Sequence, residues 1–348
     1  MAHLVHRGLG VRDFSLASAR LIGRAVPFDG VCLLTMDPAT LLPTSEIVEN
    51  GLPPATRPRL AEIEFGQPDF NKFAGLARCR VPAASLSEAT AGRLERSARY
   101  RELKQPNGFG DELRVALVDE AGAWGGLTLL REAGRAQFTS AEAATVASLS
   151  RHIVEGLRRT VLMSEPDREA SQPGDTGLLL LADDDDSIAV ADAAARAWLA
   201  ELGAASPGDR LPAVIEGASR RARAAAERPG ESDVVASARV RTAAGRWLVV
   251  RGSMLGDQVA VILEPARPPE LAPLIAHAYG LTERERGVTE LVAQGLSTNE
   301  IAGRLRLAPY TVQDHLKSIF EKTGVGTRGE LVARLFFDHY APRLSSGE

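Results

Sequence analysis

The stretch of sequence that decides the fold of the C-terminal region covers residues 281–325 and reads LTERERGVTELVAQGLSTNEIAGRLRLAPYTVQDHLKSIFEKTGV. Thr282 and Glu285 have the spacing of a capping box, and Ser297 and Glu300 repeat that spacing. In a capping box the two side chains satisfy backbone N–H groups that the first turn of a helix leaves without partners. The stretch therefore predicts two helices that begin at these positions.

A third helix follows and has the most informative spacing. It begins at Pro309, whose fixed φ and missing N–H suit the first position of a helix. Gly295 separates the first two helices, and Gly324 ends the third. Apolar residues recur along the third helix at i, i+4, i+7 and i+8, which predicts one buried stripe of Val312, Leu316, Ile319 and Phe320.

The turn between the second and third helices, Arg306 to Ala308, is short enough for a tight helix-turn-helix. The second helix offers the stripe a packing surface of Ile301, Ala302 and Leu305. The opposite face of the third helix then points to solvent and carries Tyr310, Gln313, Asp314 and Lys317. A helix with such a polar face fits the major groove of DNA, where its side chains can reach base edges.

Over about a fifth of the chain, the sequence resembles the LuxR-type (GerE-like) helix-turn-helix of bacterial transcription regulators. The residues that carry the resemblance are Leu281-Thr-Glu-Arg-Glu, Gly295-Leu-Ser, Glu300-Ile-Ala, Thr311-Val, His315-Leu, Ile319, Lys322-Thr-Gly-Val and Arg328. It implies that the third helix reads the major groove and that the domain acts as a dimer. The residues expected to contact bases are Gln313, Asp314 and Lys317. Those expected to contact the DNA backbone are Thr298, Tyr310, Thr311, His315, Lys322 and Arg328.

Two residues depart from the family's pattern. Ala308 stands where the family usually has a Ser or Thr cap, which should weaken the helix start by roughly 1 kcal/mol. Asp314 adds negative charge to the face expected to meet DNA, so it must accept from a cytosine amine or lower the affinity. The whole chain has a net charge of -4, so its attraction to DNA must be local. From Arg304 to Arg328, five basic residues against two acidic ones give +3, which predicts few phosphate contacts per subunit.

Residues 1–163 alternate helix and strand signals. The predicted elements are a helix over 11–26, strands over 30–36 and 44–49, a hairpin of 113–118 with 125–130, and a long helix after a capping box of Thr139 and Glu142. Antiparallel strands with flanking helices predict an α+β sensor domain. Three segments resemble the GAF-like domains that are joined to LuxR-type heads: Val26-Pro-Phe-Asp-Gly-Val-Cys, Asp37-Pro-Ala-Thr-Leu-Leu-Pro and Trp124-Gly-Gly-Leu-Thr-Leu. The resemblance implies a small-molecule pocket or a dimerisation role.

Residues 177–264 predict a second α+β domain. Its predicted elements are strands over 177–182 and 187–191, helices from Asp192 and over 214–227, and strands over 234–242, 246–253 and 258–263. Two strands, helices and a three-stranded meander, with the start Asp192-Ala-Ala-Ala, resemble a PAS-like domain.

Two segments are predicted to be linkers. Residues 164–176 are polar and charged, and residues 265–276 hold four prolines and should be stiff and extended. The chain is therefore expected to contain a GAF-like sensor domain (1–163), a PAS-like domain (177–264) and an all-α LuxR-type helix-turn-helix domain (277–343). We expect the last of these to fold and to bind DNA by itself.

Several other functions lack their motifs. The chain has no Gly-Lys pair for a phosphate-binding loop and no Gly-x-Ser-x-Gly motif of an esterase. The acidic run from Asp183 to Asp186 follows an apolar strand, but no lysine between Lys104 and Lys317 completes a receiver-domain pocket. Two cysteines far apart give no metal spacing. We therefore expect no enzyme activity, no catalytic residue, no metal and no cofactor.

Together these patterns predict a sequence-specific bacterial transcription regulator. No apolar run approaches the length of a membrane span, so we expect a cytoplasmic protein. Its expected partners are double-stranded DNA, a second copy of the chain and RNA polymerase, and the sensor domains leave room for an unidentified small-molecule ligand. The homodimer would use the apolar stripe of the helix after Thr139, or Leu331, Leu335 and Phe336. The alternative is a ligand-binding signalling adaptor whose helical head contacts proteins rather than DNA.

Overall fold

The structure is a computed structural model that describes residues 1–120, 122–163, 175–182, 187–204, 210–227 and 236–337. It divides into two compact units. One contains Met1–Leu157 and Gly174–Pro265, and the other contains Arg158–Pro173 and Ala266–Glu348. The linker predicted over 164–176 falls almost entirely outside the described residues, as does the acidic run 183–186.

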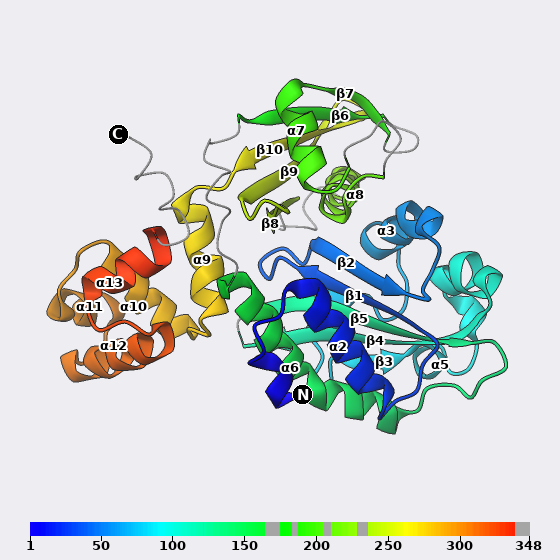
Figure 1. Cartoon of the computed structure of the whole chain (residues 1–348), viewed down its shortest axis with the longest axis horizontal. Helices are drawn as coiled ribbons and strands as arrows, with labels where there is room; N and C mark the ends of the chain where they lie inside the picture. Colours follow the sequence, from blue (N-terminus) through cyan, green and yellow to red (C-terminus); the bar gives the residue numbers. More distant parts are fainter. Residues whose placement is uncertain (121, 164–174, 183–186, 205–209, 228–235, 338–348) are drawn as a thin grey trace. The chain divides into compact units, whose positions relative to one another are not determined.

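The first unit contains two antiparallel sheets of five strands each. The first sheet has the order β2-β1-β5-β4-β3 (Figure 1). Its strands are β1 (Gly30–Met36), β2 (Pro43–Glu49), β3 (Ala83–Ser85), β4 (Phe109–Asp119) and β5 (Gly122–Glu132). The predicted strands and the β4–β5 hairpin are confirmed, whereas the short edge strand β3 was not predicted.

Helices cover both faces of this sheet. They are α1 (Ala2–Val5), α2 (Val11–Gly23), α3 (Arg57–Phe65), α4 (Phe73–Leu76), α5 (Leu86–Ala89) and α6 (Ser140–Met163), with short 3-10 or π turns at 54–56, 94–96, 100–104 and 105–107. Neighbouring residues of a strand face opposite sides of a sheet, and two glycines of β5 show what lies on each side. A Cβ on Gly125 would lie 3.3 Å from Leu157 of α6, and a Cβ on Gly126 would lie 2.5 Å from the Phe73 ring of α4. Glycine thus lets helices approach this sheet closely from both sides.

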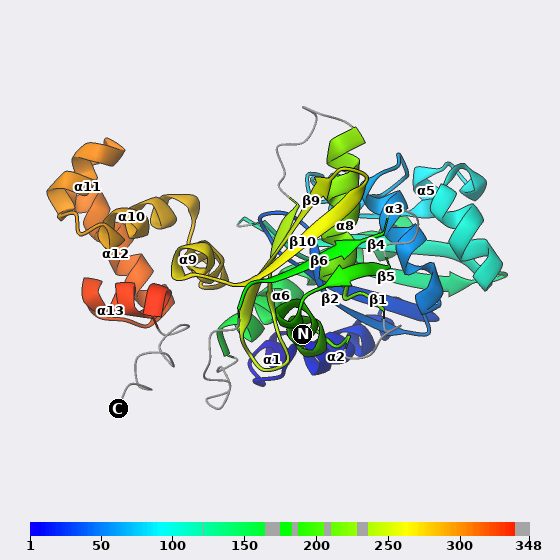
Figure 2. The same ribbon diagram turned by 90° about the horizontal axis from the view of Figure 1, so that it is seen from above.

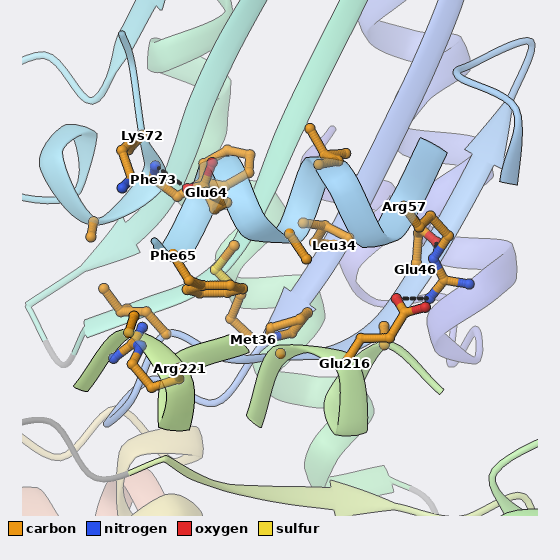
Figure 3. Close-up of a pocket in the computed structure, with 18 of the residues that line it drawn as sticks. Leu34, Met36, Glu46, Arg57, Glu64, Phe65, Lys72, Phe73, Glu216 and Arg221 are labelled. Atoms are coloured by element: carbon orange, nitrogen blue, oxygen red, sulfur yellow. Dashed lines mark hydrogen bonds and ion pairs between the residues drawn. The ribbon is translucent and has the colours of Figure 1, made fainter. Parts of the chain in front are cut away.

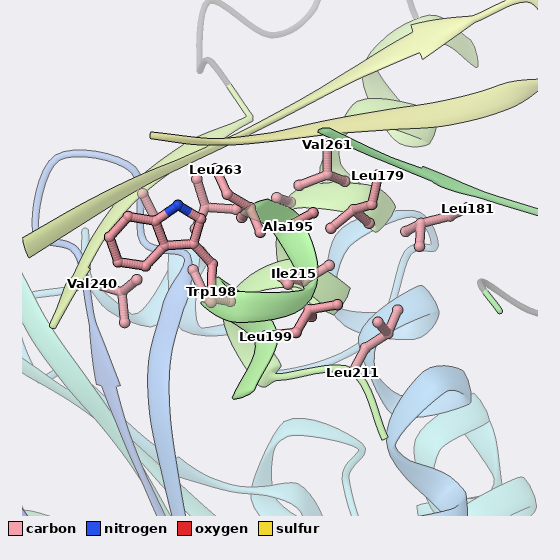
Figure 4. Close-up of a cluster of buried hydrophobic side chains, with 14 of the residues drawn as sticks. Leu179, Leu181, Ala195, Trp198, Leu199, Leu211, Ile215, Val240, Val261 and Leu263 are labelled. Carbon is pink, nitrogen blue, oxygen red and sulfur yellow. The ribbon is translucent and has the colours of Figure 1, made fainter. Parts of the chain in front are cut away.

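The second sheet has the order β7-β6-β10-β9-β8 (Figure 1), and Figure 2 labels its strands β6, β9 and β10. Its elements are β6 (Gly177–Leu181), β7 (Ile188–Ala191), α7 (Ala193–Glu201), α8 (Ala213–Glu227), β8 (Ser237–Arg241), β9 (Trp247–Leu255) and β10 (Gln258–Pro265). Trp198 of α7 and Ile215 of α8 lie in one apolar core with Leu179 and Val261 of the strands (Figure 4). The indole Nε1 of Trp198 donates to the carbonyl oxygen of Asp175 at 2.8 Å, so the buried ring keeps no unsatisfied donor.

The two sheets share one compact unit because α8 packs against α3 and β2 as well as against its own sheet. Leu42 is fully buried in the core of the second sheet. Asp37, which is 3% exposed, accepts from the backbone N–H, Nε and Nη2 of Arg239 at 2.8, 2.8 and 2.6 Å. A buried charge is tolerated when a partner of this kind compensates it. The upstream region is thus held together by bonds between residues far apart in the sequence.

The second unit is helical. Its helices are α9 (Pro268–Ala278), α10 (Glu283–Ala293), α11 (Thr298–Leu305), α12 (Pro309–Thr323) and α13 (Arg328–Val332), followed by a π turn over 333–337. The prediction of an extended linker over 265–276 was therefore wrong for most of its length. Pro268 and Pro269 occupy the first turn of α9, where a missing N–H costs nothing. Pro273 lies inside the helix, and burial of the apolar face, including Leu271 and Ile275, outweighs that local cost.

Both surfaces expected to receive a partner helix are used within the chain. On α6, Val146, Ile153 and Leu157 are at most 2% exposed. Beyond Gly329, Leu331 and Leu335 are equally buried, and the π turn that contains Leu335 contacts α9. Leu149 and Val161 of α6, and Phe336, are only half-buried, so a dimer held by these helices stays a prediction.

Candidate nucleic-acid interface

Two capping boxes begin α10 and α11, as predicted. Thr282 Oγ1 accepts from the Glu285 N–H at 3.3 Å, and Glu285 Oε2 accepts from the Thr282 N–H at 2.7 Å. Ser297 and Glu300 make the same two bonds at 3.3 and 2.7 Å. These bonds join residues only three positions apart, so the local sequence is sufficient to place both helix starts.

The turn before α12 uses a left-handed residue. Arg306 has a φ of 56°, and the next N–H, that of Leu307, donates to the Ala302 carbonyl at 2.9 Å. Ala308 is the residue before α12 and provides no side-chain cap, as its methyl side chain predicts. Gly324 ends the helix with a φ of 67°. The helix-turn-helix is thus well defined at every boundary except the uncapped start of α12.

The predicted stripe of α12 is buried against α10 and α11. Val312 and Ile319 are fully buried, Leu316 is 7% exposed, and Phe320 is half-buried. Ile301 of α11 and Val288 of α10 are also fully buried. Because one face of α12 is held by this core, the opposite face has a defined orientation.

The opposite face is polar and exposed. Gln313, Asp314 and Lys317 are exposed, and none of them has a side-chain hydrogen bond or ion pair within the part of the chain that the structure describes. Tyr310 is 70% exposed one turn earlier on the same face. These four side chains form one continuous surface, which we call the outer face of α12. They are available to a partner without loss of an internal contact.

Three of the residues expected to contact the DNA backbone also make contacts inside the unit. Lys322 Nζ lies 2.7 and 2.9 Å from the two carboxylate oxygens of Glu285. Arg328 donates from Nη1 to the Leu296 carbonyl at 2.6 Å and from Nη2 to Thr298 Oγ1 at 2.7 Å. These bonds hold α12 to α10 and α13 to the start of α11. Sequence reasoning missed this role because it assigned Glu285 to the capping box alone.

Glu285 is the centre of this network. Ser318 Oγ donates to Glu285 Oε1 at 2.6 Å, in addition to the bonds from Lys322 and from the Thr282 N–H. Burial raises the pKa of Glu285, but these hydrogen bonds outweigh it and lower the pKa to about 2. The carboxylate is therefore ionised at neutral pH, and it braces α10 and α12 against each other.

Other cations of this unit remain exposed. Arg304 near the end of α11 and Arg306 in the turn are exposed, as is Lys317. Thr311 and His315, which were also assigned to the DNA backbone, are half-buried at the start and middle of α12. The sequence indicated Arg304 and Arg306 only as part of the local positive charge, and exposed cations of this kind can attract phosphates.

The described residues contain little that suggests a different kind of site. They hold no group of three or more His, Cys, Asp or Glu side chains that could bind a metal ion. None of the helices described is long and apolar enough to cross a membrane. Burial and the nearby Glu46 carboxylate raise the pKa of the Cys32 thiol to about 12, so this cysteine is protonated and unreactive at neutral pH.

Comparison with known proteins places the helical unit in a family. Residues 280–335 match the family described as "Bacterial regulatory proteins, luxR family". This segment is a LuxR-family helix-turn-helix domain. The prediction made from its capping boxes and apolar stripe is confirmed for this part of the chain.

Curated relatives match the same part of the chain. The transcriptional regulatory protein UhpA of Escherichia coli strain K12 is 48% identical over 56 residues, which are 16% of this chain and 29% of UhpA. The transcriptional regulatory protein DesR of Bacillus subtilis strain 168 is 40% identical over 67 residues, 19% of this chain and 34% of DesR. The probable transcriptional regulatory protein NarL of Mycobacterium tuberculosis is 38% identical over 85 residues, 24% of this chain and 36% of NarL. Their names describe these relatives as transcriptional regulatory proteins, and the matches cover at most about a third of their lengths.

Among solved structures, Escherichia coli SdiA has a weak likeness to this chain. The alignment covers 95% of this chain and 91% of SdiA, at 12% identity and a TM-score of 0.31. A likeness at that TM-score carries no argument about the upstream unit.

Proposed function

We propose that this protein is a sequence-specific, DNA-binding transcription regulator of the bacterial cytoplasm, with the outer face of α12 as its reading surface. The observation that carries the proposal is the exposed, unpartnered set of Gln313, Asp314 and Lys317 on the third helix of a LuxR-family domain. The upstream unit, with a GAF-like first sheet and a PAS-like second sheet, would receive the signal. DNA binding and signal binding would then be linked through the relative free energies of two states of the protein.

The chemistry of the outer face suits base recognition. A glutamine at position 313 can donate to N7 and accept from N6 of adenine, and a lysine at position 317 can donate to guanine O6 and N7. Asp314 can accept from the N4 amine of cytosine. Arg304 and Arg306, exposed nearby in sequence, would supply phosphate contacts. The adaptor alternative is less favoured because these polar and cationic side chains resemble a nucleic-acid surface more than the apolar centre of a protein interface.

Selection of binding sites from randomised DNA by the full-length protein tests the proposal. Each of the alanine variants at 313, 314 and 317 should change the preference at one position of the site, at a cost of roughly 1–3 kcal/mol. Glu290→Ala, an exposed change on α10, is the matched control and should leave the preference unchanged. Salt-independent or undetectable DNA binding would reject the proposed function. An unchanged preference in all three variants would reject the assignment of the outer face.

We also propose that the protein binds DNA as a homodimer and that its DNA-bound form contacts RNA polymerase. A single head with a local charge of about +3 makes few phosphate contacts, whereas two linked heads on one duplex combine their affinities. The site would be an imperfect inverted repeat with half-sites about one helical turn apart or closer. Light scattering of the full-length protein, free and bound to DNA, gives the mass. A single copy in both states would contradict the dimer.

A further inference from the structure

A cavity of about 280 Å³ lies inside the upstream unit, where the two sheets meet. Its walls come from β1 and β2, from α3 and α4 of the first sheet's layer, and from α8 of the second (Figure 3). Its volume is close to the lower end of the range typical of small-molecule sites, roughly 300–1,000 Å³. Because elements from both sheets line it, any molecule inside would contact both at once.

The middle of the cavity is apolar. Met36 and Phe73 are 6% and 4% exposed, and Leu34, Leu60 and Phe65 complete the wall between the sheet and α3. Figure 3 shows the ring of Phe65 and the side chain of Met36 between the two charged ends of the cavity. Two aromatic rings and aliphatic side chains of this kind favour a flat or short apolar body.

At one end of the cavity the charges compensate one another. Arg57 lies 2.9 Å from Glu46 through Nε and 3.5 Å from Glu216 through Nη2. Glu64, which Figure 3 shows away from these residues and beside Phe73, also has a partner for each oxygen: one accepts from Arg114 at 2.8 Å and the other from the Phe73 N–H at 2.8 Å. None of these three carboxylates is left without a partner.

The other end has a cation without a counter-ion. Arg221 on α8 is half-buried, and the one side-chain hydrogen bond that it makes with described residues, from Nη2 to the Thr40 carbonyl, is long at 3.4 Å. Its Cζ lies 5.1 Å from the centre of the Phe65 ring. No carboxylate of the described residues lies within ion-pair distance of Arg221, and burial lowers its pKa, partly offset by Glu64. A guanidinium nevertheless stays protonated in proteins, so the charge remains.

The charges of the side chains that line the cavity also favour an anionic ligand. Four basic side chains face three acidic ones: Arg57, Lys72, Arg114 and Arg221 against Glu46, Glu64 and Glu216. Lys72 donates to the Gln67 carbonyl at 2.8 Å and lies towards the Arg221 end in Figure 3. Glu64, which lies beside Lys72 and Phe73 in Figure 3, already pairs with Arg114 at 2.8 Å, so Arg221 has no ion pair among the described residues. A partly buried charge of this kind is stabilised by an anion that enters the cavity.

We propose that this cavity binds a small organic acid with one carboxylate and an apolar, preferably aromatic, body. The carboxylate would pair with Arg221, and the body would lie against Phe65, Phe73 and Met36. The inference rests on the proposed function in one respect, since it makes this acid the signal that the regulator receives. Binding would stabilise the contact between α8 and the first sheet, because the ligand adds contacts to both.

Calorimetric titration and thermal unfolding of the full-length protein test the inference. The probes are benzoate, phenylacetate and 3-phenylpropionate, and each acid is compared with its uncharged primary amide. At least one acid should bind saturably, raise the melting temperature, and bind roughly tenfold or more tightly than its amide. No saturable binding of any acid at millimolar concentration, or equal affinity for acid and amide, would overturn the proposal.

Two variants separate the carboxylate from the cavity. Arg221→Gln should lower the affinity for the acid by roughly tenfold or more and leave that for the amide nearly unchanged. Ala224→Leu, which fills space on α8, should weaken acid and amide alike. Arg20→Gln, on the exposed side of α2, is the control and should change neither. If Arg221→Gln fails to fold, Ala224→Leu still tests the proposal, because undiminished acid binding by that variant would show that the acid does not bind in this cavity.

Measuring DNA binding with the same preparations distinguishes failure of the cavity inference from failure of the proposed function. Specific DNA binding without acid binding would reject the cavity inference alone. Acid binding that depends on Arg221, without DNA binding, would support the cavity site and reject the regulator. If both occur, the acid should change DNA affinity, and DNA should change acid affinity by the same factor.

Discussion

The upstream unit and the helix-turn-helix unit use charged side chains in opposite ways. In the upstream unit, Arg99, Lys104 and Glu112 are at most 4% exposed, and both cations lie 2.6 Å from oxygens of Glu112. In the helix-turn-helix, most charges are exposed, and the outer face of α12 carries Asp314 and Lys317 with no internal partner in the described chain. Charges of the first kind hold the fold together, whereas those of the second kind can change without unfolding it. The comparison supports the proposal that the outer face of α12 reads DNA.

The largest effect should come from the buried cluster. Glu112→Gln leaves Arg99 and Lys104 without their shared carboxylate, and it should lower the free energy of unfolding of the upstream unit by about 3–5 kcal/mol. Urea unfolding followed by circular dichroism measures this loss. Glu132→Gln, an exposed change at the end of β5, is the control and should cost less than about 0.5 kcal/mol. Equal losses in both variants would contradict the stabilising role given to the buried charges of the upstream unit.

Glu285 is the exception in the helical unit, because its charge is buried, and it sharpens the comparison. Glu285→Gln should destabilise a fragment of residues 266–343 by roughly 1–3 kcal/mol at neutral pH, since Lys322 and Ser318 lose a charged acceptor. The folded-state pKa of about 2 lies below the ordinary value of 4.5. The contribution is therefore fully present above about pH 4.5 and is lost as the pH falls towards 2. Unfolding of both proteins from pH 7 to pH 2 should show the difference between them disappear, and a constant difference would contradict the role of the charge.

Two lysines of α12 should behave differently towards DNA. Lys317→Ala should lower DNA affinity. If the side chain contacts a phosphate, the slope of the logarithm of the DNA-binding constant against the logarithm of salt concentration should fall by up to about one unit. If it contacts a base, the base preference should shift. Lys322→Ala should instead lower the stability of the unit, with little change in that slope, because its ammonium is bound to Glu285. Fluorescence anisotropy at several salt concentrations, with melting curves of both variants, separates the two. A reduced salt slope in Lys322→Ala with unchanged stability would show that Lys322 contacts DNA rather than bracing the unit.

The smallest effect concerns the uncapped start of α12. Ala308 makes no side-chain cap, so Ala308→Ser should stabilise the fragment of residues 266–343 by about 0.5–1 kcal/mol. Ala293→Ser, a half-buried change at the end of α10 with no free helix start to cap, is the comparison and should not stabilise it. A gain in melting temperature for position 308 alone would show that the helix start is limited by its missing cap.

Much of the helix-turn-helix could be predicted because its signals are local. Thr282 and Glu285, and Ser297 and Glu300, bond across three positions, and the stripe from Val312 to Ile319 repeats at helical spacing. The strands of both sheets could be located for the same reason, from runs of apolar residues and the turns between them. The roles of Lys322 and Arg328 could not, because their partners lie 37 and 32 residues away.

By itself, the sequence determined that residues 280–335 form a LuxR-family helix-turn-helix, which face of α12 is apolar and which is polar, and where most of the secondary structure lies. Only the tertiary structure decided that residues 268–278 are a helix, that most of the stripe of α6 is covered by the chain itself, and that Asp37 joins the two sheets through Arg239. It also placed Arg221 beside an apolar cavity with no carboxylate of the described residues within ion-pair distance. The physical reason is range: caps and helical periodicity act within a few residues, whereas burial and ion pairing depend on which distant segments the fold brings together.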